Sequence, residues 1–476
     1  MAMGTRKPGE SQEEMWVARA ALPTSPGHPF YQRLQQLLDE SQFDAYVEGR
    51  CQRFYAEKMG RPSLAPGVYF RLLLIGYFEG IDSERGIAWR ASDSLGLRRF
   101  LRMGLEESGP DHSTISRTRR RIDVETHQEV FQWVLRVVAE KGLLKGQTVA
   151  IDATTLEANA ALRSIVRRDS GEGYQEFLKR LAQESGMATP TREDLARLDR
   201  KRRHKGSNDE WEHPHDPEAR ITKMKDGRTH LAHKVEQAVD LGSGAVVAVT
   251  IQGADQGDTA TVMETLAEAG MAIAEVACAT NNEEVGERVN PMGPAEVVLD
   301  KGYHSNETLV DLKQLEVRTY CSEPDRGRRR WPGKREEQAA VYGNRRRIGG
   351  ERGKGLLRQR GEKIERSFAH LYETGGLRRV HLRGQRNILK RVLVHVAGFN
   401  LGVVMRRVFG KGTPRGLQGH RVELLLALLR VWREAWGLES GLEGSQGEAG
   451  AISRPREPSA RASLANTKSA TSTTGC

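Results

Sequence analysis

The feature that most constrains the fold is the run AEVVLDKGYHS, which extends from Ala295 to Ser305. Its apolar start, up to Leu299, is typical of a short buried strand, and Asp300 follows where that strand ends. Gly302 then breaks the pattern before a helix begins. A carboxylate at the end of a buried strand is costly unless a cation, partner or substrate needs it there. A single such Asp also commonly opens a turn, so companions decide its meaning.

A second carboxylate occupies a similar place. Asp152 directly follows the β-like run Thr148–Ile151, in the sequence IDATTLEAN. Downstream, residues 231–240 alternate apolar and polar side chains, Gly242–Gly244 turn the chain, and residues 245–251 form a second apolar run. This pattern predicts a β-hairpin. We expect adjacent strand ends to bring Asp152 and Asp300 together, with a helix packed on the sheet supplying a third carboxylate.

We expect the third carboxylate on a helix that lies after residue 355. At roughly 100° per residue, Leu357, Ile364 and Phe368 point in one direction and form an apolar stripe. Glu365 lies about 90° from the centre of this stripe, at the border between core and solvent, whereas Glu362 lies about 150° away, on the outer face. We therefore choose Glu365 and keep Glu362 as the fallback. Three such oxygen ligands suit Mg²⁺ or Mn²⁺, and two ions would serve an in-line phosphoryl transfer.

The charge balance indicates a polyanionic partner. Among 476 residues, 74 Lys and Arg face 63 Asp and Glu, so the net charge is +11. Nucleic acid is the first candidate and an acidic membrane surface the second. The four cysteines form no CxxC pair, which argues against a zinc ribbon and fits a reducing compartment. No run of about 18 apolar residues and no signal-like start occurs, so we expect a cytoplasmic protein that does not bind membranes.

Two basic segments are candidates for contact with DNA. Gly109–Ile122 reads GPDHSTISRTRRRI, in which Asp111 or Ser113 is a good N-cap for a basic helix. A short helix, a Gly/Pro break and such a helix are typical of a helix-turn-helix, although a solvated basic helix is the alternative. The arginines that it would present to DNA are Arg117, Arg119, Arg120 and Arg121. From Arg326 to Arg366, fifteen Lys and Arg accompany five Glu, which we interpret as a basic linker contacting the DNA backbone.

The composition also predicts the domain organisation. Residues 1–29 are a disordered lead-in, 30–142 a helical DNA-binding domain, and 147–410 a catalytic domain with a polar insertion at about 157–229. A C-terminal helix is expected over 411–439, and residues 440–476, which lack aromatic side chains, are expected to be disordered. Within the insertion, His213 and His215 lack a further ligand at metal-binding spacing, so a surface loop is the better interpretation.

Together these segments resemble the bacterial insertion-sequence transposases with a DDE catalytic domain. The resemblance rests on IDATTLEAN, on the hairpin HKVEQAVDLGSGAVVAV, on LDKGYHS, on GEKIERSFAHLYETGG and on PDHSTISRTRRRI. It implies an α/β fold, with a ribonuclease-H-like mixed sheet and flanking helices preceded by an all-α, helix-turn-helix-like domain. It also implies a triad of Asp152, Asp300 and Glu365 that holds two divalent ions, with cleavage at the element's ends and strand transfer.

One departure from the family concerns the residues around the third carboxylate. Many relatives carry Tyr, Arg and Lys at set offsets from the catalytic Glu, where this chain has Arg358, Gly361 and Tyr372. Arg358 and Arg366 are our candidates to contact the DNA backbone in place of the family's Tyr, Arg and Lys. Lys301, directly after Asp300, is a further candidate for contact with DNA.

The partners and the alternatives follow from this hypothesis. The resemblance implies binding to terminal inverted repeats and to target DNA, in a homodimer or larger assembly within the bacterial cytoplasm, associated with the nucleoid. A related metal-dependent nuclease would cut without joining, using the same triad. A non-catalytic DNA-binding protein would use only the arginines at 117–121, and its DNA binding would not depend on Mg²⁺.

Overall fold

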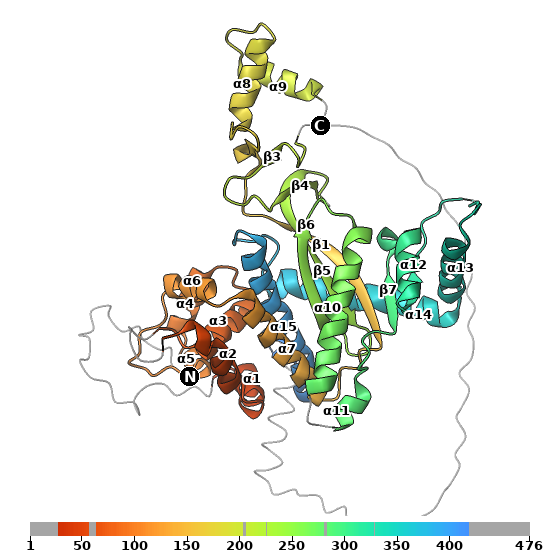
Figure 1. Ribbon diagram of the computed structural model, residues 1–476. Helices are drawn as coiled ribbons and strands as arrows, with labels where there is room; N and C mark the ends of the chain where they lie inside the picture. The colour runs from red at the N-terminus through yellow and green to blue at the C-terminus, as the bar shows by residue number, and fades with distance from the viewer. Residues whose placement is uncertain are drawn as a thin grey trace, which may run out of the picture. The chain divides into compact units, whose positions relative to one another are not determined.

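The computed structural model describes residues 27–56, 63–202, 206–224, 226–279, 283–327 and 329–417. Most of the predicted lead-in, all of the predicted tail and residues 418–439 of the expected helix over 411–439 therefore lie outside the described residues. Within these ranges the fold is mixed α/β, with one six-stranded sheet and many helices (Figure 1).

The N-terminal part of the chain is helical, as its apolar periodicity predicts. Its helices are α1 (Pro29–Glu40), α2 (Phe43–Cys51), α3 (Pro66–Glu79), α4 (Glu84–Asp93), α5 (Leu95–Phe100), α6 (His112–Arg121) and α7 (Val124–Glu140). Polar side chains begin several of them: Asp111 accepts a hydrogen bond from the Ser113 backbone N–H, and Asp123 does the same for Thr126. The cap of the basic helix is thus Asp111, one of the two predicted residues.

A long apolar helix joins these helices to the sheet. Helix α15 (Gln385–Phe409) packs against α3 and α7 on one side and against strand β6 (Val246–Gly253) on the other. The Asn400 side chain accepts a hydrogen bond from the Val246 backbone N–H at 2.9 Å and donates one to its carbonyl oxygen at 2.8 Å. One continuous hydrophobic core therefore extends from Phe30 to Met405.

By its length and composition alone, helix α15 could also span a membrane. In the part of the chain that the structure describes, it belongs to the one segment, Gln385–Gly416, that is long and apolar enough to cross a membrane. Its apolar window is 89% buried within the protein. Burial of this kind is what the helix at the centre of a core requires, because both of its faces contact other elements.

The central sheet contains β1 (Thr148–Glu157), β4 (Arg220–Lys223), β5 (Thr229–Asp240), β6, β7 (Glu296–Leu299) and β8 (Arg318–Cys321). Strand β5 is antiparallel to β1 and to β6, which confirms the predicted hairpin. Strand β7 lies parallel to β1, and β8 lies parallel to β7. Strand β1 is longer than predicted and continues past Asp152, because β5 pairs with it as far as Glu157.

Helices cover both faces of the sheet. Figure 1 shows α10 (Asp258–Ala279) in front of the strands and α14 (Glu351–Ala369) behind them, and both contact β1. The part of the chain between α10 and α14 also contains the helices α11 (Glu283–Arg288), α12 (Asn306–Gln314) and α13 (Arg335–Gly349). Because both faces are covered, every residue of β5 from Leu231 to Asp240 is buried, including its charged ones.

The predicted basic linker is wrong over residues 335–349, which form α13, and over the first residues of α14, which begins at Glu351. The helix expected after residue 355 is confirmed as the rest of α14. Several basic side chains of the predicted linker have partners inside the protein. Arg345 pairs with Glu323, and Arg347 donates to the Thr319 carbonyl oxygen at 2.8 Å. The Asn344 side chain exchanges hydrogen bonds with the backbone of Cys321, so α13 closes the edge of β8.

The predicted insertion forms structure of its own. It contains β2 (Val166–Arg167), α8 (Tyr174–Glu184), α9 (Arg192–Lys201) and β3 (Trp211–Glu212), packed around a separate small core. Trp211 is 1% exposed at the centre of this core. His213 is buried too, contrary to the surface-loop interpretation, and the fully buried Asp216 accepts a hydrogen bond from His233 at 3.1 Å. Tertiary contacts with β5 therefore outweigh the polar local composition.

Candidate active site

Asp152 and Asp300 come together through strand register. The last recorded pairs between the parallel strands β1 and β7 are Val149 with Val297 and Ala150 with Val298. Asp152 and Asp300 each lie two residues further along, so they occupy equivalent points of neighbouring strands. Adjacent strands lie about 4.8 Å apart, which brings the two carboxylates to one edge of the site. Both side chains are partly exposed there, by 29% and 40%.

Backbone groups orient both carboxylates. Asp152 Oδ1 accepts a hydrogen bond from the Ala153 N–H at 2.9 Å. Asp300 caps the short 3₁₀ turn Lys301–Tyr303, where its Oδ1 accepts the Gly302 N–H at 2.7 Å. Burial raises the pKa of Asp152; Arg360 opposes this shift, while the negative charges of Asp300 and Asp258 add to it.

A cation lies between the two carboxylates. Arg360, on α14, places Nη2 2.8 Å from Asp152 Oδ2 and 3.8 Å from Asp300 Oδ2. Its side chain is only 13% exposed. Our sequence analysis missed this residue, although the same helical wheel places Arg360 about 50° from the centre of the apolar stripe, nearer the core than Glu365.

The structure does not bring Glu365 to the two aspartates. Glu365 is exposed on α14, five residues after Arg360, and this separation corresponds to about 140° around the helix axis. Glu362 is exposed as well and forms an ion pair with Arg366 at 2.8 Å. The apolar stripe used to place them is real, since Ile364 is 1% and Phe368 9% exposed. Across the described ranges, no group of three His, Cys, Asp or Glu side chains is arranged to hold a metal ion.

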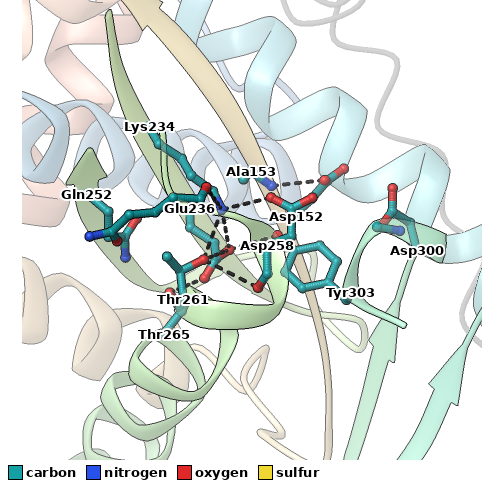
Figure 2. A network of polar contacts seen from close by, with 12 residues as sticks. Asp152, Ala153, Lys234, Glu236, Gln252, Asp258, Thr261, Thr265, Asp300 and Tyr303 are labelled. Atoms are coloured by element: carbon teal, nitrogen blue, oxygen red, sulfur yellow. Dashed lines mark hydrogen bonds and ion pairs between the residues drawn. The ribbon is translucent and has the colours of Figure 1, made fainter. Parts of the chain in front are cut away.

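A third carboxylate, that of Asp258 at the start of α10, also lies beside Asp300. A Cβ added to Gly302 would lie 2.6 Å from Asp258 Oδ2 and 3.1 Å from Asp300 Oδ1, so both carboxylates converge on this glycine. Figure 2 shows Asp152, Asp258 and Asp300 arranged around Tyr303. Lys234 forms an ion pair with Asp258 at 2.7 Å. A Cβ at position 302 would therefore displace the Asp258 carboxylate.

A buried polar network supports this arrangement from the α10 face of the sheet (Figure 2). Glu236 is fully buried and accepts hydrogen bonds from Tyr303 Oη at 2.8 Å and from Thr261 Oγ1 at 2.9 Å. Lys234 Nζ donates to Thr261 Oγ1 at 2.9 Å. The network therefore ties the turn after Asp300 to β5 and α10. In the sequence, the signal for this buried network was the pair of charged residues, Lys234 and Glu236, within the apolar pattern of the hairpin.

The predicted DNA-binding residues fall into two groups. Arg117, Arg120 and Arg121 are exposed on α6, whereas Lys301 is exposed directly after Asp300 and Arg358 and Arg366 are exposed on α14. Arg119 differs, because it is 9% exposed and forms an ion pair with Glu84 at 2.8 Å. It also donates to Asn387 Oδ1 at 2.8 Å. Arg119 therefore holds α6 against α4 and α15.

Two transposase families match parts of the chain. The family described as Transposase domain (DUF772) matches residues 19–121, which include α1 to α6. The family described as Transposase DDE domain matches residues 314–405, which include β8, α13, α14 and most of α15. The second match contains Arg360 and Glu365 but begins after the two aspartates. No curated protein matches the chain.

Proposed function

Because this chain belongs to the insertion-sequence DDE transposases, we propose that it cuts DNA at the ends of its own element and joins those ends to target DNA. The observation that carries the proposal is the pair of carboxylates, Asp152 and Asp300, at equivalent points of neighbouring parallel strands with a cation between them. The pair is built to hold positive charge at the edge of a sheet.

The arrangement of the sheet supports a ribonuclease-H-like catalytic domain. Strands β6, β5, β1, β7 and β8 follow one another across the sheet, with β5 antiparallel to β6 and to β1, and with β1, β7 and β8 mutually parallel. This order places the first carboxylate on the central strand and the second on its parallel neighbour. Helices on both faces, α10 and α14, then close the site from either side.

The chemistry of the donors fits Mg²⁺ or Mn²⁺. Asp152 and Asp300 offer hard carboxylate oxygens, and the guanidinium between them shows that these oxygens accept a cation. When bound, two such ions would activate a water or a 3′-hydroxyl and stabilise the leaving oxygen of an in-line phosphoryl transfer. The chain's own part is to hold and orient the ions: the Ala153 and Gly302 N–H groups fix the two carboxylates.

For the third carboxylate we retain Glu365 as the proposal, on the resemblance and the helical wheel. Its exposed place on α14 requires a change of conformation before it can reach the aspartates, and Glu362 faces the same requirement. Asp258 is the competing candidate, because it already converges with Asp300 on Gly302. Cleavage by the single variants Glu365→Gln, Glu362→Gln and Asp258→Asn separates these assignments.

DNA transposases bind DNA. In this proposal, the exposed basic side chains of the protein contact the DNA. Arg117, Arg120 and Arg121 would contact the DNA backbone from a helix-turn-helix-like α6, while Lys301, Arg358 and Arg366 would contact it near the aspartates. Arg119 would keep α6 in place. Cutting and joining two ends calls for a homodimer or larger assembly, working in the bacterial cytoplasm.

The test uses the purified full chain with a DNA fragment that carries the ends flanking its gene, in Mg²⁺, Mn²⁺ or EDTA. Metal-dependent nicks at the ends together with joined products support the transposase. Nicks without joining favour a nuclease that uses the same residues. Binding without cutting in any metal favours a non-catalytic DNA-binding protein.

A further inference from the structure

Arg360 occupies the place where a cation shared by Asp152 and Asp300 would be bound. Its Nη2 approaches an oxygen of each carboxylate, at 2.8 Å and 3.8 Å. A magnesium ion binds carboxylate oxygens at about 2.0–2.1 Å and needs their lone pairs directed toward it. A guanidinium and a metal ion therefore cannot occupy this place together, because they compete for the same oxygens and repel each other.

We propose that Arg360 is an internal counter-ion that competes with the divalent metal and that DNA withdraws it, so that metal binding is coupled to DNA binding. This inference rests on the proposed function, since it assumes that Asp152 and Asp300 hold the metal. It adds a residue to the site, with the role of controlling when the metal enters.

The contacts of Arg360 are those of a side chain that can exchange partners. Its Nε and Nη2 are buried and form no aligned hydrogen bond with the described residues, so the interaction with Asp152 is one of charge rather than of paired, directional bonds. A buried cation with unsatisfied donors is expensive to keep. A phosphate oxygen pair offers the guanidinium two aligned, charge-assisted hydrogen bonds instead.

The surroundings allow the side chain to move while the helix stays in place. Ile364 and Phe368 anchor α14 in the core. Beside Arg360, an added Cβ at Gly361 would meet no heavy atom within 4 Å, which shows open space on that side of the helix. Arg358 and Gln359, its neighbours, are exposed. A DNA backbone lying along this surface would therefore come within reach of the Arg360 guanidinium.

The coupling follows from thermodynamic linkage. If DNA binds better when Arg360 has left the carboxylates, and the metal also binds better then, each ligand raises the affinity for the other. Removing the charge at position 360 should then strengthen metal binding without DNA and weaken the effect of DNA on it. Two charges about 4 Å apart near a protein surface interact strongly enough for a change of tenfold or more in metal affinity.

The experiment measures Mn²⁺ binding to the full-length protein by calorimetry and by the loss of the free-ion electron paramagnetic resonance signal. The variants are Arg360→Met, Arg360→Lys and Asp152→Asn. Lys354→Met is the matched control, since Lys354 is an exposed cation of the same helix. We expect Arg360→Met to bind Mn²⁺ about tenfold more tightly or better than wild type, and Arg360→Lys and Lys354→Met to resemble wild type.

A second arm adds duplex DNA that carries the element's end. DNA should tighten Mn²⁺ binding to wild type and to Lys354→Met, and change it little in Arg360→Met. If wild type binds Mn²⁺ through Asp152 while Arg360→Met binds it no more tightly and responds equally to DNA, the counter-ion proposal is overturned and the proposed function stands. If Mn²⁺ binding is absent from every variant, or unchanged in Asp152→Asn, the proposed metal site fails and this inference fails with it. If Arg360→Met does not fold, Arg360→Lys still tests the proposal, because it keeps the positive charge. Metal binding by Arg360→Lys that is clearly weaker or stronger than that of wild type would contradict a role for charge.

Discussion

Asp152 and Asp300 lie at equivalent points of two parallel strands, each two residues beyond the pair formed by Ala150 and Val298. A shift of one residue in this register would turn one of the carboxylates to the opposite face of the sheet. The site therefore depends on the pairing of β1 with β7, which the apolar residues Val149, Val297 and Val298 hold in the core.

The first prediction concerns these two carboxylates. Asp152→Asn and Asp300→Asn should each lower the rate of end cleavage about a hundredfold or more, because each removes a metal-holding charge from the transition state. Binding of the ends, measured by gel shift, should persist. Asp209→Asn, an exposed Asp of the insertion, is the control. Cleavage at the wild-type rate in either site variant would refute the assignment.

The second prediction separates the candidates for the third carboxylate. Glu365→Gln should abolish cleavage while Glu362→Gln retains it, because the wheel places Glu365 nearer the sheet. Asp258→Asn is measured in parallel in the same assay. Loss of cleavage in Asp258→Asn with full activity in Glu365→Gln would instead show that the site is completed from α10.

The third prediction concerns the exposed arginines of α6. Replacing Arg120 and Arg121 by Ala should weaken binding to all DNA sequences and flatten the dependence of log affinity on log salt by about 0.9 per lost phosphate contact. Fluorescence anisotropy over a series of salt concentrations measures both. An altered sequence preference with an unchanged salt slope would mean that these side chains read bases.

The fourth prediction concerns Arg119, whose place in the structure is interior. Arg119→Ala should lower the free energy of unfolding by about 3 kcal/mol, because it leaves the half-buried carboxylate of Glu84 without its partner. Arg120→Ala, on the exposed side of the same helix, should change it by less than about 0.5 kcal/mol. Urea unfolding followed by circular dichroism provides the measurement. Equal stabilities of the two variants would contradict the interior role.

The fifth prediction follows from the raised pKa of Asp152. Because its folded-state pKa lies above the unfolded value, the contribution of this group to stability is present at low pH and is lost as pH rises through the folded pKa. Asp152→Asn mimics the protonated form, so it should be more stable than wild type at neutral pH, and the difference should vanish below about pH 4. Urea unfolding between pH 3 and pH 8 tests this. A variant less stable at neutral pH would show that the pairing with Arg360 outweighs burial.

Local pattern accounts for a large part of the fold. The apolar runs before Asp152 and Asp300, the hairpin, the strand at Arg318–Cys321 and the cap at Asp111 all depend on periodicity or on capping chemistry within a few residues. The helix α13 and the first turn of α14 were missed, because a high density of arginine hides a sparse apolar face, whereas the rest of α14 was predicted from its apolar stripe. Pairing with Glu323 and Thr319 satisfies those arginines, and these partners lie more than twenty residues away in the chain.

The sequence by itself determined the hairpin, the strands that lead to Asp152 and Asp300 and the apolar face of α14, and it determined which two aspartates end beside each other. These follow from side-chain periodicity and from the rule that buried carboxylates need a partner. Only the tertiary structure decided that Arg360 rather than Glu365 faces those aspartates, that Asp258 converges with Asp300 on Gly302, and that Arg119 is interior. Each of these depends on how a helix packs against other elements, and that choice is made by contacts between segments far apart in the chain.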